Sequence, residues 1–163
     1  LARQNEQKKR KLSVTISVND IRQAAKTLDG HIIRTPLLSA PALSRRLGCE
    51  IFVKLECLQH TSSFKARGAY MAMQDLTHEQ RKKGVIAMSA GNHAQAVAYH
   101  AERMDVPATI VMPAQTPFAK VARTRAFGAK VVLEGRNLNE CEDTVATLIA
   151  EHSLTLKIGR AHV

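Results

Sequence analysis

The sequence has no tryptophan and few other aromatic residues, with two tyrosines and four phenylalanines among 163 residues. So few stacking side chains argue against a platform for single-stranded nucleic acid. No run of eighteen apolar residues occurs, so no membrane-spanning helix is expected. The three cysteines are scattered and form no C-x-x-C pair, which argues against a disulfide framework and predicts a protein of the reducing cytoplasm. The seven histidines show no H-E-x-x-H spacing, so no metal site is predicted.

Acidic residues are also scarce, since 24 lysines and arginines accompany 14 acidic residues and give a formal net charge of +10. The excess is concentrated in the first twelve residues, where five basic residues stand beside a single glutamate. We therefore predict a solvated basic leader over residues 1–17 and no nucleic-acid partner. A folded module without catalysis, whose leader contacts an acidic partner, is the alternative from another functional class.

Apolar strand-like runs alternate with helical patterns from position 51 onward. The expected strands are 51–56, 85–88, 108–112 and 130–133, and the helices that follow them are 64–76, 92–104, 117–127 and 138–152. Two further helices are expected at 18–28 and 40–47. This alternation predicts an α/β fold with an open parallel sheet and helices on both faces. Dinucleotide-binding and P-loop domains are excluded, because neither glycine-rich phosphate motif occurs.

A lysine stands at the start of one expected helix, in the stretch from Ser62 to Ala69 that reads SSFKARGA. Because a strand is expected just upstream, Lys65 should lie near the carboxyl end of that strand, where open α/β sheets bind ligands. A helix N-terminus carries partial positive charge and disfavours an ammonium group. Lys65 is therefore a candidate for an amine that forms an imine with a carbonyl compound.

A second motif, Ser89 to Gln95, reads SAGNHAQ and opens the helix after the next strand. Its hydroxyl, amide and free backbone N–H groups surround a glycine and suit a carboxylate or a phosphate. Taken alone, Asn92 is equally compatible with a plain N-cap. Two successive strand-to-helix corners predict that both motifs lie at the same edge of a parallel sheet.

Together the two motifs resemble the threonine dehydratase (threonine ammonia-lyase) branch of the fold type II pyridoxal-phosphate enzymes, which also contains serine racemase. The flanking runs Arg34-Thr35-Pro36-Leu37 and Ile110-Val111-Met112-Pro113 add to the resemblance, which extends from about Asn19 to Leu156. It implies that Lys65 holds pyridoxal phosphate covalently, that Phe64 packs beside the cofactor ring, and that Asn92 bonds the ring's 3-oxygen. It also implies a loop that receives the substrate carboxylate, formed by Ser89, Gly91, Asn92 and His93.

The activity implied by the resemblance is β-elimination from a small hydroxy amino acid. L-Threonine would give 2-oxobutanoate and ammonia, as in isoleucine biosynthesis, and serine and hydroxyaspartate are the alternative substrates. Racemases of this family resemble the chain except that a serine replaces Ala90. Because alanine cannot carry a proton, dehydration is favoured over racemisation. The resemblance further implies a homo-oligomer in the intact enzyme and no membrane partner.

The family pattern also requires a glycine-rich phosphate loop and a residue that faces the pyridine nitrogen, both expected beyond Val163. We therefore expect a fragment that is inactive or binds the cofactor weakly. Its expected parts are the leader 1–17, a segment 18–50 that belongs to the large domain of the intact enzyme, a small domain 51–156 with Lys65, and a non-native tail 157–163.

Overall fold

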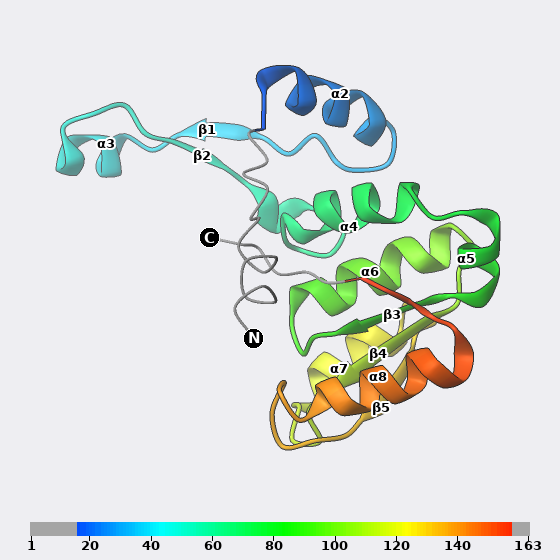
Figure 1. Cartoon of the computed structure of the whole chain (residues 1–163). Helices are drawn as coiled ribbons and strands as arrows, with labels where there is room; N and C mark the ends of the chain where they lie inside the picture. The colour runs from blue at the N-terminus through cyan, green and yellow to red at the C-terminus, as the bar shows by residue number, and fades with distance from the viewer. Residues whose placement is uncertain (1–15, 158–163) are drawn as a thin grey trace, which may run out of the picture.

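A four-stranded parallel sheet in the order β5-β4-β3-β6 forms the centre of the computed structural model, which describes residues 16–157 (Figure 1). The strands are β3 (Val85–Met88), β4 (Ala108–Met112), β5 (Lys130–Leu133) and β6 (Thr155–Leu156). The first three confirm the predicted strands residue for residue, whereas the two-residue β6 is too short to leave a periodic signal. Residues 1–15 and 158–163, the bulk of the predicted leader and tail, lie outside the described residues.

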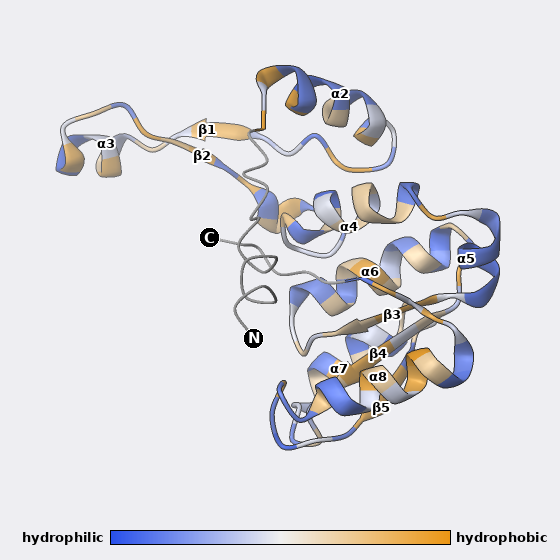
Figure 2. Cartoon of the chain, viewed as in Figure 1, coloured by the Kyte–Doolittle hydropathy of each residue, from blue (hydrophilic) through white to orange (hydrophobic). Residues whose placement is uncertain are grey.

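Helices cover both faces of the sheet, because successive side chains of a strand point to opposite sides. Val85, Ala87 and Ile110 belong to one core, which they share with α4 (Lys65–Gln74), α6 (Asn92–Arg103) and α7 (Phe118–Arg125). Ile86 and Val111 belong to the opposite core, beneath α8 (Cys141–His152). Figure 2 shows apolar residues along β3 and β4, as expected for strands that are buried on both faces. The predicted α/β class is confirmed.

Residues 16–58 form an arm that extends away from the sheet (Figure 1). Its elements are α2 (Val18–Leu28), β1 (Leu37–Ser39), α3 (Pro41–Leu47), β2 (Phe52–Lys54) and the 3₁₀ helix η2 (Glu56–Leu58). The prediction that 51–56 starts the parallel sheet is wrong, because β2 pairs antiparallel with β1 in a separate two-stranded ribbon. The position beside β3 is taken by β6, whose Thr155 and Leu156 pair with Val85 and Ile86.

One α-helix was not predicted, and several are shorter than predicted, among them α4, α7 and α8. Helix α5 (His78–Lys83) was not predicted, although it begins with a capping box in which Thr77 and Gln80 bond each other's backbone N–H. Helix α8 begins at Cys141 rather than at 138, since Asn137 Oδ1 accepts a hydrogen bond from Glu140 N at 3.1 Å and forms a turn there. Within residues 16–157, no helix has both the length and the apolarity that a membrane crossing requires.

Candidate active site at the start of two helices

Two helices of the body carry the residues of the candidate site at their N-terminal ends, and α6 starts just after the carboxyl end of β3. Helix α4 packs along α6, and both helices start on the same side of the molecule (Figure 1). Lys65 is the first residue of α4, and Asn92 and His93 are the first two residues of α6. The charge of Lys65 contributes to lowering the pKa of His93, although burial of the imidazole contributes more. The structure therefore brings the lysine and the second motif together, even though α4 does not follow a strand of this sheet.

Lys65 is half-buried, and its amine lies beside an aromatic ring. Its Nζ is 5.2 Å from the centroid of the Phe64 ring, within the range of a cation–π contact. Phe64 is the N-cap of α4 but supplies no side-chain cap, and 57% of its surface is exposed. The amine and an open aromatic face are thus available to the same bound molecule.

The start of α6 leaves backbone donors open, whereas Ser89 N in the loop before it is already bonded to Val111 O. Ser89 Oγ accepts a hydrogen bond from Gly91 N at 3.2 Å, and Gly91 is an extended N-cap without a side-chain cap bond. Asn92 is exposed, and within the described residues its side chain has no hydrogen-bond partner. Because the first N–H groups of a helix have no partner in the helix itself, the first turn of α6 offers several donors to an anionic group.

The ring of His93 is turned toward the protein rather than toward the loop. Its Nε2 lies 3.2 Å from the backbone oxygen of Lys157, directly after β6. Burial is the main cause of its lowered pKa, so the ring is neutral at pH 7 and Nε2–H donates to that carbonyl. What His93 can offer an anion at the start of α6 is therefore its backbone N–H.

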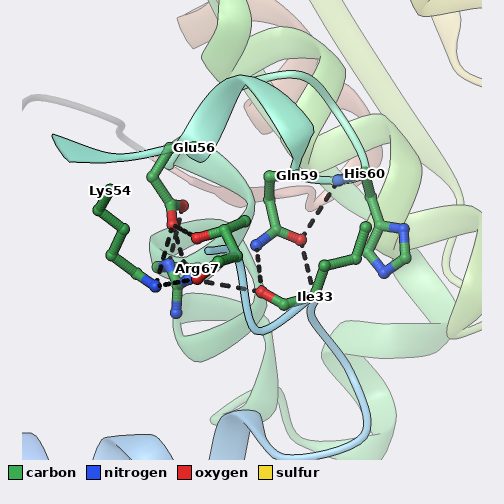
Figure 3. A network of polar contacts seen from close by, with 7 residues as sticks. Ile33, Lys54, Glu56, Gln59, His60 and Arg67 are labelled. Atoms are coloured by element: carbon green, nitrogen blue, oxygen red, sulfur yellow. Dashed lines mark hydrogen bonds and ion pairs between the residues drawn. The ribbon is translucent and has the colours of Figure 1, made fainter. Parts of the chain in front are cut away.

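A network of polar contacts ties the start of α4 to the arm (Figure 3). Arg67 donates to both oxygens of Glu56, at 2.9 Å through Nε and at 2.7 Å through an Nη atom. Thr35 Oγ1 donates to the same carboxylate at 2.5 Å. These bonds, with that from Arg67 foremost, hold the pKa of Glu56 down at about 2, and the carboxylate in turn raises the pKa of Arg67. The sequence offered Arg67 and Thr35 only as parts of motifs, and Glu56 was missed.

Gln59 closes the other side of the same network. Its Oε1 accepts from Ile33 N at 2.9 Å and its Nε2 donates to Ile33 O at 2.9 Å, as a neighbouring strand would. Gln59 is 3% exposed, so both ends of its amide are satisfied away from water. The chain that leads to Lys65 is thereby fixed at Glu56 and Gln59 against residues 33–35.

Two buried hydroxyls that shortly precede Lys65 in the chain test whether this segment fits a cofactor. Thr61 Oγ1 and Ser63 Oγ are shielded from solvent and have no hydrogen-bond partner within the described part of the chain. A buried polar group without a partner costs about 1–3 kcal/mol, so such groups indicate a place that a ligand or a water completes. With the Lys65 amine, the Phe64 ring and the open donors of α6, this set fits a cofactor that carries an aldehyde and anionic groups, as pyridoxal phosphate does.

Known proteins resemble the chain over most of its length. Residues 28–158 match the family described as pyridoxal-phosphate dependent enzyme. The chain is 45% identical over 140 residues to an L-threo-3-hydroxyaspartate ammonia-lyase of Pseudomonas sp, covering 86% of the chain and 44% of that protein. It is 49% identical over 125 residues to an L-threonine ammonia-lyase of Thermotoga maritima, covering 77% of the chain and 31% of that protein.

Solved structures show the same fold. Serine racemase from Dictyostelium discoideum superposes with a TM-score of 0.80 at 34% identity, covering 88% of this chain and 47% of that one. The processed threonine deaminase isoform 2 of Solanum lycopersicum superposes with a TM-score of 0.76 at 37% identity, covering 87% of this chain and 40% of that one. The chain thus spans less than half the length of these relatives.

Proposed function

Because the chain belongs to the family of pyridoxal-phosphate dependent enzymes, we propose that it carries the catalytic lysine of an ammonia-lyase that acts on a hydroxy amino acid, L-threonine first among them. The observation that carries the proposal is that Lys65, at the start of α4, lies within the electrostatic reach of His93 at the uncapped start of α6. The 49% identity to an L-threonine ammonia-lyase supports the choice of substrate. Hydroxyaspartate and serine are the neighbouring candidates.

Each residue of the site has a proposed task in holding its ligands. Lys65 Nζ holds the cofactor covalently, Phe64 packs against its ring, and Asn92 donates to the 3-oxygen. The substrate carboxylate lies against Ser89, Gly91, Asn92 and the backbone of His93, because a helix N-terminus with free N–H groups stabilises an anion. When bound, pyridoxal phosphate supplies the electron sink that acidifies the Cα–H bond of an amino acid.

The same amine serves for proton transfer. Lys65 Nζ, when it is not bonded to the cofactor, accepts the proton from the substrate Cα as a general base. The β-hydroxyl leaves as water, and subsequent hydrolysis of the product releases ammonia. For L-threonine the sum of these changes is 2-oxobutanoate and one ammonia, with no oxidant or reductant consumed.

Ala90 distinguishes elimination from racemisation. Racemisation needs a second proton carrier on the opposite face of the substrate, and Ala90, half-buried against the larger core, has no group that can carry a proton. In the protein that shows elimination activity, Ala90→Ser is expected to raise the ratio of racemised to eliminated product about tenfold or more. A chiral amino-acid assay beside a 2-oxo acid assay measures the ratio. Ala114→Ser in an exposed loop is the control, and an unchanged ratio in Ala90→Ser would contradict this role.

Reduction with borohydride tests the proposal on the chain itself. Incubation with pyridoxal phosphate, reduction and peptide mass analysis are expected to place a pyridoxyl group on Lys65. Lys65→Ala should lose this adduct, and Lys82→Ala, which removes an exposed lysine of α5, should keep it. If the wild-type chain carries no preferred adduct, the alternative of a non-catalytic folded module is favoured instead.

The remaining expectations concern the setting of the site. We propose that residues 18–50 belong structurally to a larger domain and residues 51–156 to a smaller one, that the protein works in the cytoplasm, and that the active form is a homo-oligomer. The exposed apolar side chains of β1, which lies within residues 18–50, support the first point, since a two-stranded ribbon is marginal in water without further packing.

A further inference from the structure

A buried histidine links the two helices of the site directly. His100 lies in the third turn of α6 and is 2% exposed. Its Nε2 is 2.9 Å from the backbone oxygen of Ala66, in the first turn of α4 and adjacent to Lys65. The bond therefore runs from the middle of one helix to the start of the other. Ala66 is itself fully buried, so water does not compete for its carbonyl.

The surroundings of His100 fix the state of its ring. Tyr70 of α4 and Tyr99 of α6 contact it edge to face, with ring centroids at 5.2 Å and 4.9 Å. Burial lowers the pKa of His100 to about 4, and nearby His60, Arg103 and His31 act in the same direction. The imidazole is therefore neutral at pH 7. Because Nε2 faces a carbonyl, it must carry the hydrogen and donate.

We propose that His100 is a positioning residue for Lys65: its Nε2–H bond to Ala66 O fixes the first turn of α4 and so the direction in which the lysine amine points. This inference rests on the proposed function of Lys65 as the reacting amine. Nothing in the bond involves the cofactor, so the role can be measured on the chain alone. His100 does not contact the reacting atoms and acts only through the backbone next to them.

The size of the effect follows from the value of one buried hydrogen bond. Losing such a bond costs about 1–1.5 kcal/mol, equivalent to a roughly five- to tenfold change in an equilibrium or a rate. His100→Leu keeps an apolar side chain between the tyrosines but has no donor. His100→Gln keeps an amide nitrogen near the place of Nε2 and can restore the bond. The reactivity of the Lys65 amine in His100→Leu is therefore expected to differ from that in the wild-type chain by about fivefold. In His100→Gln the difference from wild type is expected to be about twofold or less.

The test is competitive trace labelling of amines with acetic anhydride, below the melting temperature and over a range of pH, read by peptide mass analysis. The ratio of labelling at Lys65 to labelling at exposed Lys82 reports the environment of the lysine amine. Wild type, His100→Leu and His100→Gln are compared with Val97→Ala, which removes buried volume from α6 without touching the bond to Ala66.

A ratio or pH profile that changes in His100→Leu, returns in His100→Gln and stays at the wild-type value in Val97→Ala supports the positioning role. Equal ratios in all four proteins, with only the melting temperature lowered, would show that His100 is merely a packing residue and would overturn the inference. The borohydride experiment decides separately whether Lys65 reacts with pyridoxal phosphate. Failure of the proposed function is therefore distinguishable from failure of the positioning role.

Discussion

The sheet body, residues 59–157, and the arm, residues 16–58, bury their apolar side chains to very different extents. Val85, Ile86 and Ile110 on the central strands are 0% exposed. On the β1–β2 ribbon, Leu37 is 61% exposed and Phe52 is 55% exposed. Both strands of the ribbon are exposed along their whole length, whereas β3 and β4 are covered on both faces.

Strands with similarly apolar side chains therefore form a buried core in the body but leave an exposed surface in the arm. The body completes its core because the crossover helices return to its sheet after each strand. Within the described residues, no helix crosses back to cover the β1–β2 ribbon in this way. The arm is instead joined to the body by the packing of α2 against α4 and by the polar contacts of Glu56, Gln59 and Arg67.

The largest expected effect is a difference between two truncations. Ile110→Ala on β4 is expected to lower the free energy of unfolding by about 3 kcal/mol, because it removes a fully buried side chain and leaves a cavity. Phe52→Ala on β2 removes a larger but mostly exposed side chain and is expected to cost under about 1 kcal/mol. Urea unfolding of both variants measures the difference. Equal losses would mean that the ribbon is packed in solution, and would break the contrast between the two regions.

The junction of the two regions should respond to pH. The pKa of Glu56 is about 2 in the folded chain and near 4.5 without its partners, so the ionised carboxylate stabilises the fold fully above pH 4.5. This stabilisation is lost progressively as the pH falls from 4.5 toward 2. Its size is roughly 1–3 kcal/mol, since the side chain is 18% exposed and is partly screened by water.

Glu56→Gln is therefore expected to be less stable than wild type at pH 7 and to show a flatter decline below pH 4.5. Unfolding free energies measured at several pH values between 2.5 and 7 give the two profiles. The matched control is Glu140→Gln, because Glu140 pairs with Arg136 at the surface of the body, where that arginine is 84% exposed. A profile of Glu56→Gln that runs parallel to wild type would exclude the junction as the pH-sensitive element.

Strand pairing was predicted more accurately in the body than in the arm, for a physical reason. In the body, β3, β4 and β5 are short, mostly apolar runs whose neighbours follow from right-handed crossovers, so local pattern and topology agree. The run 51–56 shows equally clearly that a strand exists, but alternation cannot tell which strand pairs with it. That choice depends on Thr155 and Leu156, which occupy the place beside β3, and on residues 37–39, which offer an antiparallel edge.

The candidate site likewise has a part that the sequence could predict and a part that it could not. Lys65, Asn92 and His93 could be predicted because short motifs mark the starts of two helices. Their supporting contacts could not, because the bonds of Glu56 to Arg67 and of His100 to Ala66 join residues 11 and 34 positions apart. Nothing in a periodic pattern indicates such a pair, and the orientation of the His93 ring toward Lys157 is also a property of the folded chain.

The smallest expected effect concerns two glycines, one in each region. A Cβ added to Gly68 on α4 would meet no atom within 4 Å, and glycine inside a helix is destabilising. Gly68→Ala is therefore expected to raise the free energy of unfolding by about 0.5–1 kcal/mol. Gly48 ends α3 in the arm with φ +70°, so Gly48→Ala is expected to lower it by about 1 kcal/mol. Urea unfolding measures both. A Gly68→Ala variant that is more stable than wild type yet forms less pyridoxyl adduct at Lys65 would show that the glycine allows the bound cofactor to approach α4 closely. A Gly68→Ala variant that is less stable than wild type would mean that this face of the helix is already covered.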